Sequence, residues 1–376
     1  MQERTRDLRQ LRVAIVHPFL ISNGGGEKVV EALVATFPRA ELFTLMADRS
    51  TLSPLLLERP IHTTVLDRGP RAWRYYQHLS PLYDFATARH DVSGFDLVIS
   101  SGGPGAKTVT VPGGIPHIHY CHSPVRYLWD QHETWLERLP LAIRPAFALS
   151  VRGQRKRDLA AVNRVDSFVA NSRYIAARIR RYYGRDSAVV YPPVSLSSAP
   201  VMERAGDYYL TVGRLVPGKR TELLIAACNR LRRRLIVAGG GAELAALQAL
   251  AGETVEVLGR VSETRLQELY AGARAFLFAA DEDFGIATVE AQSYGLPAIA
   301  YGHGGSLEIL SDGAEGTTPD AVFFAEQSSA AVEGAIVQFE AEEDRFDRCE
   351  IQRRAARFSA ERFREGMAGV VLEALR

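Results

Sequence analysis

The feature that most constrains the fold of this 376-residue chain is a recurring order of short apolar run, glycine-rich loop and helical stretch. Apolar runs occupy residues 12–17, 40–46, 95–101, 116–121 and 166–170, and a second series occupies residues 208–212, 234–238, 255–258, 275–279, 297–301 and 321–324. Strands that alternate with helices form parallel sheets covered on both faces. The sequence therefore predicts an α/β protein with two doubly wound, Rossmann-like domains.

The two series are separated by Pro192 and Pro193, which we interpret as a hinge. The predicted domains are residues 1–194 and 195–357, and residues 358–376 have the spacing of an amphipathic helix. Ligands of open α/β sheets bind beyond the carboxyl ends of the strands. We therefore expect the loops of the two domains to face each other across a cleft.

The composition is that of an ordinary globular chain, with 47% apolar and 24% charged residues. The net charge of +1 gives no case for nucleic acid as a partner, and the apolar runs are too short to span a bilayer. The arginine-rich first residues do not resemble a secretory signal. Three cysteines, Cys121, Cys228 and Cys349, stand in unlike contexts and predict no disulfide framework. These features together predict a cytoplasmic protein.

Basic residues are concentrated in one part of the chain, because residues 144–185 contain eleven Arg or Lys and two acids. A second group combines basic and aromatic side chains: Arg68, Arg71, Trp73, Arg74, Tyr75, Tyr76 and Tyr83. With the basic residues 152–157, this group predicts peripheral contact with an anionic membrane, at the inner face of the cytoplasmic membrane. The alternative is an interior aromatic helix with solvated arginines.

Residues 281–297 carry the most specific chemical signal. Glu282 and Glu290 stand on either side of a turn at Asp283, Phe284 and Gly285. A helix that begins near Gly285 would direct unpaired N–H groups and its positive dipole end at a bound anion. An anion site flanked by two acids suits a ligand that has phosphate and many hydroxyls, such as a nucleotide sugar. The alternative is a solvated helix N-terminus, where acids are common.

A second signal lies at residues 212–220, on a strand-to-helix loop. Arg214 and Lys219 are five positions apart, so a turn between them could present both cations to one diphosphate. Fixed cations stabilise the negative charge that develops on a departing nucleoside diphosphate, without a metal ion. A solvated basic loop is the alternative.

As an ordered set, these segments resemble the retaining glycosyltransferase family 4. The segments are Val212-Gly-Arg-Leu-Val-Pro-Gly-Lys, Glu282-Asp-Phe-Gly and Glu290-Ala-Gln-Ser-Tyr-Gly-Leu-Pro, and Tyr270-Ala-Gly-Ala-Arg-Ala also fits. The resemblance covers the chain from about residue 12 to its end. It implies the GT-B architecture, in which the final helix crosses back to the N-terminal domain and no metal site is required.

The resemblance also implies roles for individual residues. Arg214 and Lys219 would bind the donor diphosphate, Glu290 the ribose and Glu282 the transferred sugar, with His122 near that sugar. The catalytic residues so implied are His122, Arg214, Lys219 and Glu282. The donor-binding set is Gly25, Gly26, Gly213, Arg214, Lys219, Gly259, Arg260, Val261, Asp283, Phe284, Gly285, Ile286 and Glu290.

Two further segments, Tyr120-Cys-His-Ser-Pro-Val-Arg-Tyr-Leu-Trp-Asp and Tyr301-Gly-His-Gly-Gly-Ser-Leu-Glu, resemble a branch of mannosyltransferases. That branch uses GDP-mannose to build O-antigen and exopolysaccharide units, which implies transfer of α-mannose to a glycan on polyprenyl diphosphate. Arg126, Trp129 and Asp130 are the predicted acceptor residues. Two alternatives stay open: a UDP-sugar-dependent enzyme with a soluble acceptor, and a noncatalytic nucleotide-binding scaffold. The four charged residues that a scaffold would be expected to lose are all present.

Overall fold

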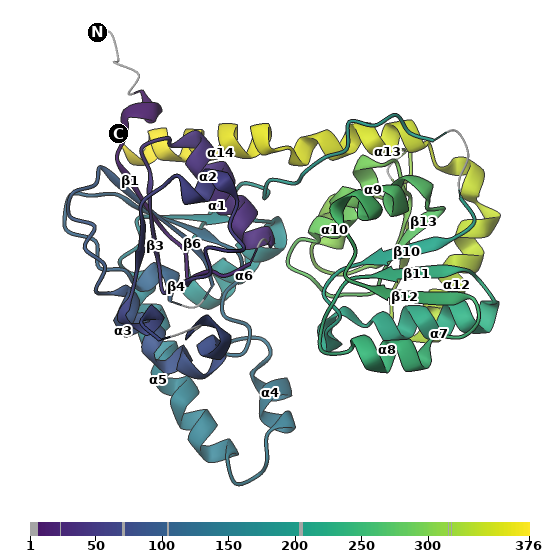
Figure 1. Ribbon diagram of the computed structural model, residues 1–376, viewed down its shortest axis with the longest axis horizontal. Coiled ribbons are helices and arrows are strands. Elements are labelled where there is room, and N and C mark those ends of the chain that lie inside the picture. Colours follow the sequence, from purple (N-terminus) through teal and green to yellow (C-terminus); the bar gives the residue numbers. More distant parts are fainter. Residues whose placement is uncertain are drawn as a thin grey trace. The chain divides into compact units, whose positions relative to one another are not determined.

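The computed structural model describes residues 7–22, 24–69, 72–103, 105–202, 206–314, 316 and 318–376. It divides the chain into two compact units. The first unit consists of Met1–Pro193 together with Ala360–Arg376, and the second unit is Val194–Ser359. Each unit is built on a parallel sheet with helices on both faces (Figure 1). The predicted α/β fold with two Rossmann-like sheets is confirmed.

The sheet of the first unit has seven strands in the order β5-β3-β1-β6-β7-β8-β9. Their bounds are β1 (Val13–Val16), β3 (Glu41–Thr44), β5 (Ile61–Thr63), β6 (Leu97–Gly102), β7 (His117–Cys121), β8 (Ser167–Ala170) and β9 (Ala188–Val189). A separate parallel pair joins β2 (Phe19–Leu20) to β4 (Met46–Ala47). The predicted run at residues 40–46 therefore divides into β3 and β4. Strands of two or three residues, including β5, are too short for a sequence pattern to reveal.

The helices of the first unit include the segment that follows the second unit in sequence. They are α1 (Gly25–Thr36), α2 (Pro54–Leu57), α3 (Tyr83–Thr87), α4 (His132–Arg138), α5 (Arg144–Val162), α6 (Arg173–Tyr183) and α14 (Ala360–Ala374). Four 3-10 helices accompany them: η1 (Leu8–Gln10), η2 (Val65–Asp67), η3 (Ala72–Leu82) and η4 (Ala106–Thr108). The apolar stripe of α14, namely Phe363, Met367 and Val371, is buried against α1 and the sheet.

The sheet of the second unit has six strands in the order β12-β11-β10-β13-β14-β15. Their bounds are β10 (Tyr209–Val212), β11 (Leu235–Ala238), β12 (Val255–Gly259), β13 (Ala275–Phe278), β14 (Ala298–Tyr301) and β15 (Ala321–Phe324). These bounds lie within a residue or so of the predicted runs because the strands other than the edge strand β12 are nearly continuous apolar segments buried on both faces.

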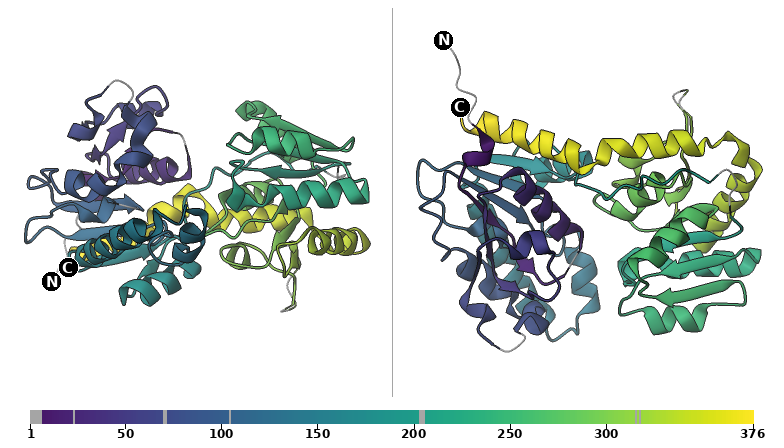
Figure 2. Two further views of the ribbon diagram at one scale, coloured as in Figure 1. Left: turned by 90° about the horizontal axis from the view of Figure 1, so that it is seen from below. Right: turned by 45° about the horizontal axis from the view of Figure 1, so that its top comes forward.

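The helices of the second unit cover both faces of this sheet (Figure 2). They are α7 (Thr221–Leu231), α8 (Leu244–Leu250), α9 (Glu263–Gly272), α10 (Ile286–Ser293), α11 (Ser306–Ile309), α12 (Ser329–Ala341) and α13 (Arg348–Ala355). The 3-10 helices are η5 (Pro217–Lys219), η6 (Glu343–Arg345) and η7 (Ala356–Phe358). Among the helices that the structure describes in either unit, none has both the length and the apolar character needed to cross a bilayer.

Candidate functional site

The strand order of the second unit reverses between β10 and β13, which are neighbours in the sheet. Loops at the carboxyl end of such a reversal diverge and leave a crevice, where ligands of open α/β sheets bind. The loop after β10 carries Lys219, and the loop after β13 carries Glu282. The Lys219 ammonium and the Glu282 carboxylate form an ion pair at this point, and both side chains are partly buried. Two residues that are 63 positions apart in sequence thus meet at the predicted site.

The loop after β10 is fixed by close contact with the glycine-rich loop after β11. The backbone N–H of Leu215 donates to the carbonyl of Gly240 at 3.0 Å. A Cβ atom on Gly239 would lie 1.8 Å from the carbonyl oxygen of Gly213, and one on Gly241 would lie 2.1 Å from that of Leu215. No side chain fits at these two positions. The glycines therefore allow the two loops to pack backbone against backbone, and this packing holds the cation-bearing loop in place.

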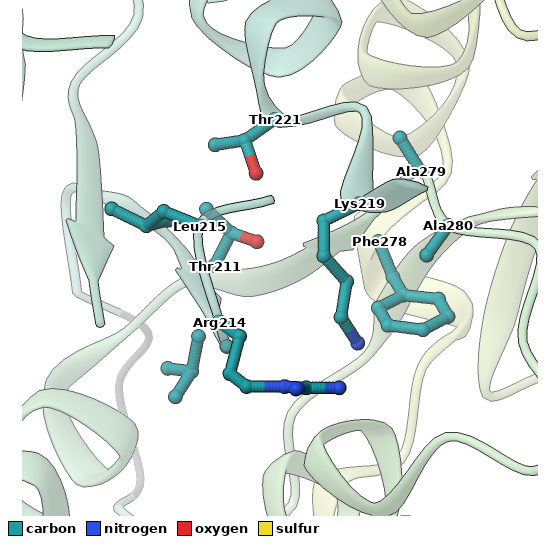
Figure 3. Close-up of a pocket in the computed structure, with 10 residues that line it drawn as sticks. Thr211, Arg214, Leu215, Lys219, Thr221, Phe278, Ala279 and Ala280 are labelled. Carbon is teal, nitrogen blue, oxygen red and sulfur yellow. The ribbon is translucent and has the colours of Figure 1, made fainter. Parts of the chain in front are cut away.

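A small pocket lies at the carboxyl end of β10 and β13 and is lined by Gly213, Arg214, Lys219 and the Phe278 ring, among others. Figure 3 shows the Arg214 and Lys219 side chains extending to the same side of the loop. The Lys219 ammonium lies 5.8 Å from the centre of the Phe278 ring, a cation–π distance. The prediction that a turn brings both cations to one locality agrees with this geometry.

The backbone of Glu282 is held by a segment that the sequence did not assign to the site. The N–H of Gly305 donates to the carbonyl of Glu282 at 2.8 Å, and a Cβ on Gly304 would lie 2.5 Å from that oxygen. His303 Nδ1 lies 2.9 Å from a carboxylate oxygen of Asp281. The resemblance implied no role for the Tyr301-Gly-His-Gly-Gly motif. Its contacts show that the motif positions the loop that carries Glu282.

Helix α10 begins at Ile286, with Gly285 as its N-cap at φ 108°, as the sequence predicted. In its first turn the N–H of Thr288 donates to the Gly285 carbonyl at 3.0 Å, while the N–H groups before it have no i−4 carbonyl in the helix and lie at the positive end of the dipole. Glu290 lies just over one turn inside, where one carboxylate oxygen accepts a hydrogen bond of 3.1 Å from the Tyr270 hydroxyl. The Tyr270 ring stacks on Tyr294 at 5.3 Å. Tyr270 therefore orients Glu290, a role that its motif in the sequence did not reveal.

Three predicted donor-binding residues, Gly259, Arg260 and Val261, lie at the end of β12, next to the glycine-rich loop after β11. Gly259 has φ 72° and its carbonyl accepts from the N–H of Gly239 at 2.8 Å. The Arg260 side chain lies over Gly240, where a Cβ atom would come within 2.8 Å of Arg260 Cγ. The loops that follow β10, β11 and β12 are therefore in contact with one another, through backbone hydrogen bonds and close packing at glycines. Val261 follows in the turn before α9.

The first unit has an equivalent reversal of strand order, between β1 and β6. His17, directly after β1, has its Nδ1 2.8 Å from the carbonyl oxygen of Ser101 on β6. The Ser101 hydroxyl lies 2.9 Å from Nε2 of His122, which follows β7. A Cβ on Gly26, in the first turn of α1, would lie 3.3 Å from the His17 ring and 3.8 Å from His122. The predicted residues Gly26 and His122 are thus neighbours, and Gly25 begins the same helix.

Both histidines of this group are held in their neutral form. Burial lowers the pKa of His122 to about 3, with the nearby His17 as a smaller cause. Burial also lowers the pKa of His17, and the carboxylate of Glu27 opposes that shift. Glu27 accepts hydrogen bonds from the Ser22 hydroxyl and from the N–H of Gly24, so its carboxylate caps the N-terminus of α1. Sequence reasoning missed His17 and Glu27, although His17 ends the first apolar run and could have been noticed there.

The predicted acceptor residues already have partners within the first unit. Asp130 accepts a hydrogen bond of 2.7 Å from the nearly buried Arg178, and Trp129 Nε1 donates to Asp158 at 3.0 Å. Asp158 also pairs with the buried Lys107. Arg126 lies on the same segment, between β7 and α4. Their role toward an acceptor stays a prediction.

For the aromatic and basic group at residues 68–83, the structure favours the interior alternative. Tyr83 is only 4% exposed and packs in a cluster with Trp73 and Tyr76. Arg71 and the Tyr75 side chain lie outside the described residues. Trp73 and Tyr76 are partly buried against Tyr83, so these three rings do not make an exposed aromatic surface. Cys121 is buried.

Within the described ranges, no group of three or more His, Cys, Asp or Glu side chains is arranged to hold a metal ion. That transfer requires no metal stays a prediction.

Family comparisons agree with this geometry. Residues 23–198 match the family described as Glycosyltransferase Family 4, and residues 203–358 match Glycosyl transferases group 1. The two matches meet near the boundary between the units and together take in most of the chain. The chain therefore belongs to these glycosyltransferases, and its two parallel Rossmann-like sheets are those of the GT-B fold.

Similar proteins of known name include a GDP-mannose-dependent alpha-(1-6)-phosphatidylinositol monomannoside mannosyltransferase of Mycolicibacterium smegmatis. It is 31% identical over 191 residues, which are 42% of this chain and 50% of that protein. A GDP-mannose-dependent alpha-mannosyltransferase of Corynebacterium glutamicum is 32% identical over 32% of this chain and 30% of its own length. The chain thus matches half or less of the length of these curated relatives.

Solved structures share the fold at lower identity. The sucrose-phosphate synthase of Thermosynechococcus elongatus has a TM-score of 0.72 at 18% identity and covers 97% of this chain and 99% of its own. Anabaena HepE, solved in complex with UDP-glucose, has a TM-score of 0.69 at 16% identity and covers 96% of this chain and 99% of its own. At such identities the likeness concerns the fold alone.

Proposed function

We propose that this protein is a retaining glycosyltransferase that moves a hexose from a nucleotide sugar, and that the hexose is α-mannose from GDP-mannose. The observation that carries the proposal is the Lys219–Glu282 ion pair at the strand-order reversal of the second unit, with Arg214 beside it. Cations for a diphosphate and a carboxylate for sugar hydroxyls occur side by side. The N-terminus of α10 adds N–H donors on the same loop.

In this proposal, donor binding exchanges the partners of the ion pair. The donor diphosphate takes Lys219 and Arg214, and Glu282 is released to accept hydrogen bonds from hydroxyls of the sugar. Glu290, oriented by Tyr270, holds the ribose hydroxyls. As the bond from the sugar to the diphosphate breaks, negative charge develops on the diphosphate, and the two cations stabilise it.

The acceptor hydroxyl would approach on the face from which the diphosphate leaves and give its proton to a phosphate oxygen. Positioning of the reactants and stabilisation of charge then supply most of the rate acceleration. No pair of carboxylates on opposite sides of the anomeric carbon is needed, in contrast to glycoside hydrolases. His122, kept neutral by its burial, would serve near the sugar as a hydrogen-bonding group.

The choice of GDP-mannose rests on the motifs and on relatives whose names include this donor. A UDP-sugar-dependent transferase is the second candidate, because HepE was solved with UDP-glucose. For the acceptor, we propose a glycan on a polyprenyl diphosphate, used in O-antigen or exopolysaccharide assembly at the inner face of the cytoplasmic membrane. A soluble acceptor is the alternative, since other relatives are named D-inositol 3-phosphate glycosyltransferases.

The test is calorimetric titration of GDP, UDP, ADP, GDP-mannose and UDP-glucose into the protein, with and without EDTA. The proposal expects GDP and GDP-mannose to bind most tightly and EDTA to have no effect. Tighter binding of UDP would move the donor to the second candidate. Absence of binding by every nucleotide would overturn the roles of Arg214, Lys219 and Glu290 together and would favour the scaffold alternative.

A further inference from the structure

Exposed large apolar side chains of the first unit are concentrated on the hairpin formed by α4, the loop 139–143 and the start of α5. Figure 1 shows this hairpin extending away from the sheet of its own unit. Its exposed members are Trp135 at 46%, Leu141 at 76%, Ile143 at 51% and Leu149 at 71%. Leu141 and Leu149 are the two most exposed large apolar side chains in the described part of the chain. Such concentrated apolar exposure marks an interaction site.

The hairpin is nonetheless an ordered element with its own internal contacts. The His132 and Phe147 rings stack at 5.8 Å and join α4 to α5. Arg144 closes the tip, because its guanidinium donates to the carbonyls of Leu139 at 3.0 Å and Glu137 at 2.9 Å. Farther along α5, Val151 is buried in a small core with Leu128. Leu141 and Leu149 therefore project from a fixed scaffold.

From the loop 139–143 onward the charged side chains of the hairpin are basic, whereas α4 carries the exposed acids Glu133 and Glu137. Residues 139–157 contain five Arg or Lys and no Asp or Glu. Leu149, Arg152 and Lys156 are spaced three and four apart, so they lie along one stripe of α5. At a helical rise of about 1.5 Å per residue, the two cations stand roughly 5 and 10 Å above Leu149 along the axis. That separation matches the depth of roughly 5–10 Å to which apolar side chains enter the bilayer interface.

We propose that the α4–α5 hairpin is a membrane-docking element, in which Leu141, Ile143 and Leu149 enter the interface of an anionic bilayer while Arg152 and Lys156 contact its phosphate headgroups. Anionic lipid is favoured over a protein partner because the exposed apolar side chains lie next to a segment with five Arg or Lys and no acid, and basic segments beside a membrane surface are attracted to anionic headgroups. The inference rests on the proposed function in one respect, since a lipid-linked acceptor gives the enzyme a reason to dock.

The experiment measures sedimentation of the full chain with vesicles of phosphatidylcholine alone and with vesicles that also contain phosphatidylglycerol. Wild-type protein should bind the anionic vesicles and be released by salt. The variant Leu141→Ser with Leu149→Ser should lose roughly tenfold or more in partition coefficient. The variant Arg152→Gln with Lys156→Gln should lose the preference for anionic lipid. The matched control is Leu250→Ser with Val337→Ser, two exposed apolar residues of the second unit, which should bind as wild type does.

A second readout locates the contact. Brominated lipid should quench the fluorescence of the wild-type protein, and Trp135→Phe should remove most of that quenching. Equal vesicle binding by wild type and the Leu141→Ser, Leu149→Ser variant would overturn the proposal. So would self-association that this variant abolishes, because the tip would then be an interface between copies. Calorimetry with GDP on the same variants separates membrane docking from donor binding. A variant that binds GDP normally but has lost vesicle binding is impaired in docking alone. A variant that binds vesicles but has lost GDP binding is impaired at the donor site.

Discussion

Both units have a reversal of strand order in their sheet, but the side chains at the two reversals differ in charge. In each, the strand order reverses beside the first strand of the unit, between β1 and β6 or between β10 and β13. At the first reversal stand His17, Ser101 and His122, whose histidines are kept neutral by burial. At the second stands the charged pair Lys219 and Glu282. Among the described residues, the reversal of the second unit thus carries the cation Lys219 in an ion pair, whereas that of the first carries neutral histidines beside Glu27, and we expect a diphosphate to bind at the second.

Within the second unit, the two ends of the sheet differ as well. At the amino end, Glu340 accepts hydrogen bonds from Arg233 at 2.7 and 2.8 Å and from the Tyr209 hydroxyl at 2.9 Å. These hydrogen bonds lower the pKa of the Glu340 carboxyl. Arg274 is a second cation on the same carboxylate, at 3.3 Å. At the carboxyl end, Lys219 and Glu282 pair with each other outside any comparable network among the described residues, so we expect a ligand to exchange with this ion pair at smaller cost.

The largest effect is expected from Lys219→Ala, which removes one of the two cations of the second unit's reversal. Because that cation stabilises charge mainly in the transition state, kcat/KM should fall by roughly 10²- to 10³-fold. The melting temperature should change little, since the ion pair is partly exposed. Transfer would be followed with GDP-mannose and a lipid-linked glycan.

The control for this variant is Arg220→Gln, which removes the next cation along the chain. Arg220 pairs with Glu222 on the start of α7 and does not line the pocket. It should retain most of the activity. Full activity of Lys219→Ala, or an equal loss in Arg220→Gln, would refute the contrast between a charged and a neutral reversal.

The next effect concerns acid stability and is confined to the first unit. Burial lowers the pKa of His117 and of His90 to about 4, and that of His119 well below its usual value. In the unfolded chain these rings take up protons from about pH 6.5 downward. The unfolded state then binds more protons than the folded state, so stability is full above about pH 6.5 and falls as the pH drops toward 4. His117 alone should cost on the order of 2 kcal/mol at about pH 5.

Urea unfolding at neutral pH and at about pH 5 tests this, with two probes. All three tryptophans, Trp73, Trp129 and Trp135, belong to the first unit, so their fluorescence reports on that unit. The second unit has one histidine, the exposed His303. The fluorescence midpoint should fall in acid more than the later part of the circular-dichroism transition. His117→Gln should reduce the slope of unfolding free energy against pH. Equal acid sensitivity of both probes would contradict the assignment.

The sequence predicted most of the two sheets, because their longer strands are apolar runs, several of which end at a glycine-rich loop. It also predicted Lys219 and Glu282 as separate signals. It did not predict that they pair, because their contact depends on β10 and β13 being neighbours in the sheet. The supporting residues Tyr270 and Gly304 were missed for the same reason: each acts through a tertiary contact. The aromatic group near Tyr83 could not be assigned from the sequence, because composition does not distinguish a buried aromatic cluster from an exposed aromatic surface.

The smallest effect is expected from Tyr270→Phe, which tests how the second unit holds its other carboxylate. Burial, and next the Glu290 charge, raise the pKa of Tyr270 well above its usual value, so its hydroxyl stays a donor to Glu290. Loss of one such hydrogen bond, worth about 1 kcal/mol, should raise KM for the donor roughly three- to tenfold and leave kcat nearly unchanged. The control is Tyr208→Phe, whose hydroxyl donates to the carbonyl of Leu269 at 2.8 Å, away from the pocket. If both variants raised KM equally, Tyr270 would be a packing residue. If only Tyr270→Phe raised KM, the neutral Tyr270 hydroxyl would be shown to position the charged Glu290. The two units would then differ in the side chains that contact the ligand, because neutral supporting residues occur in both.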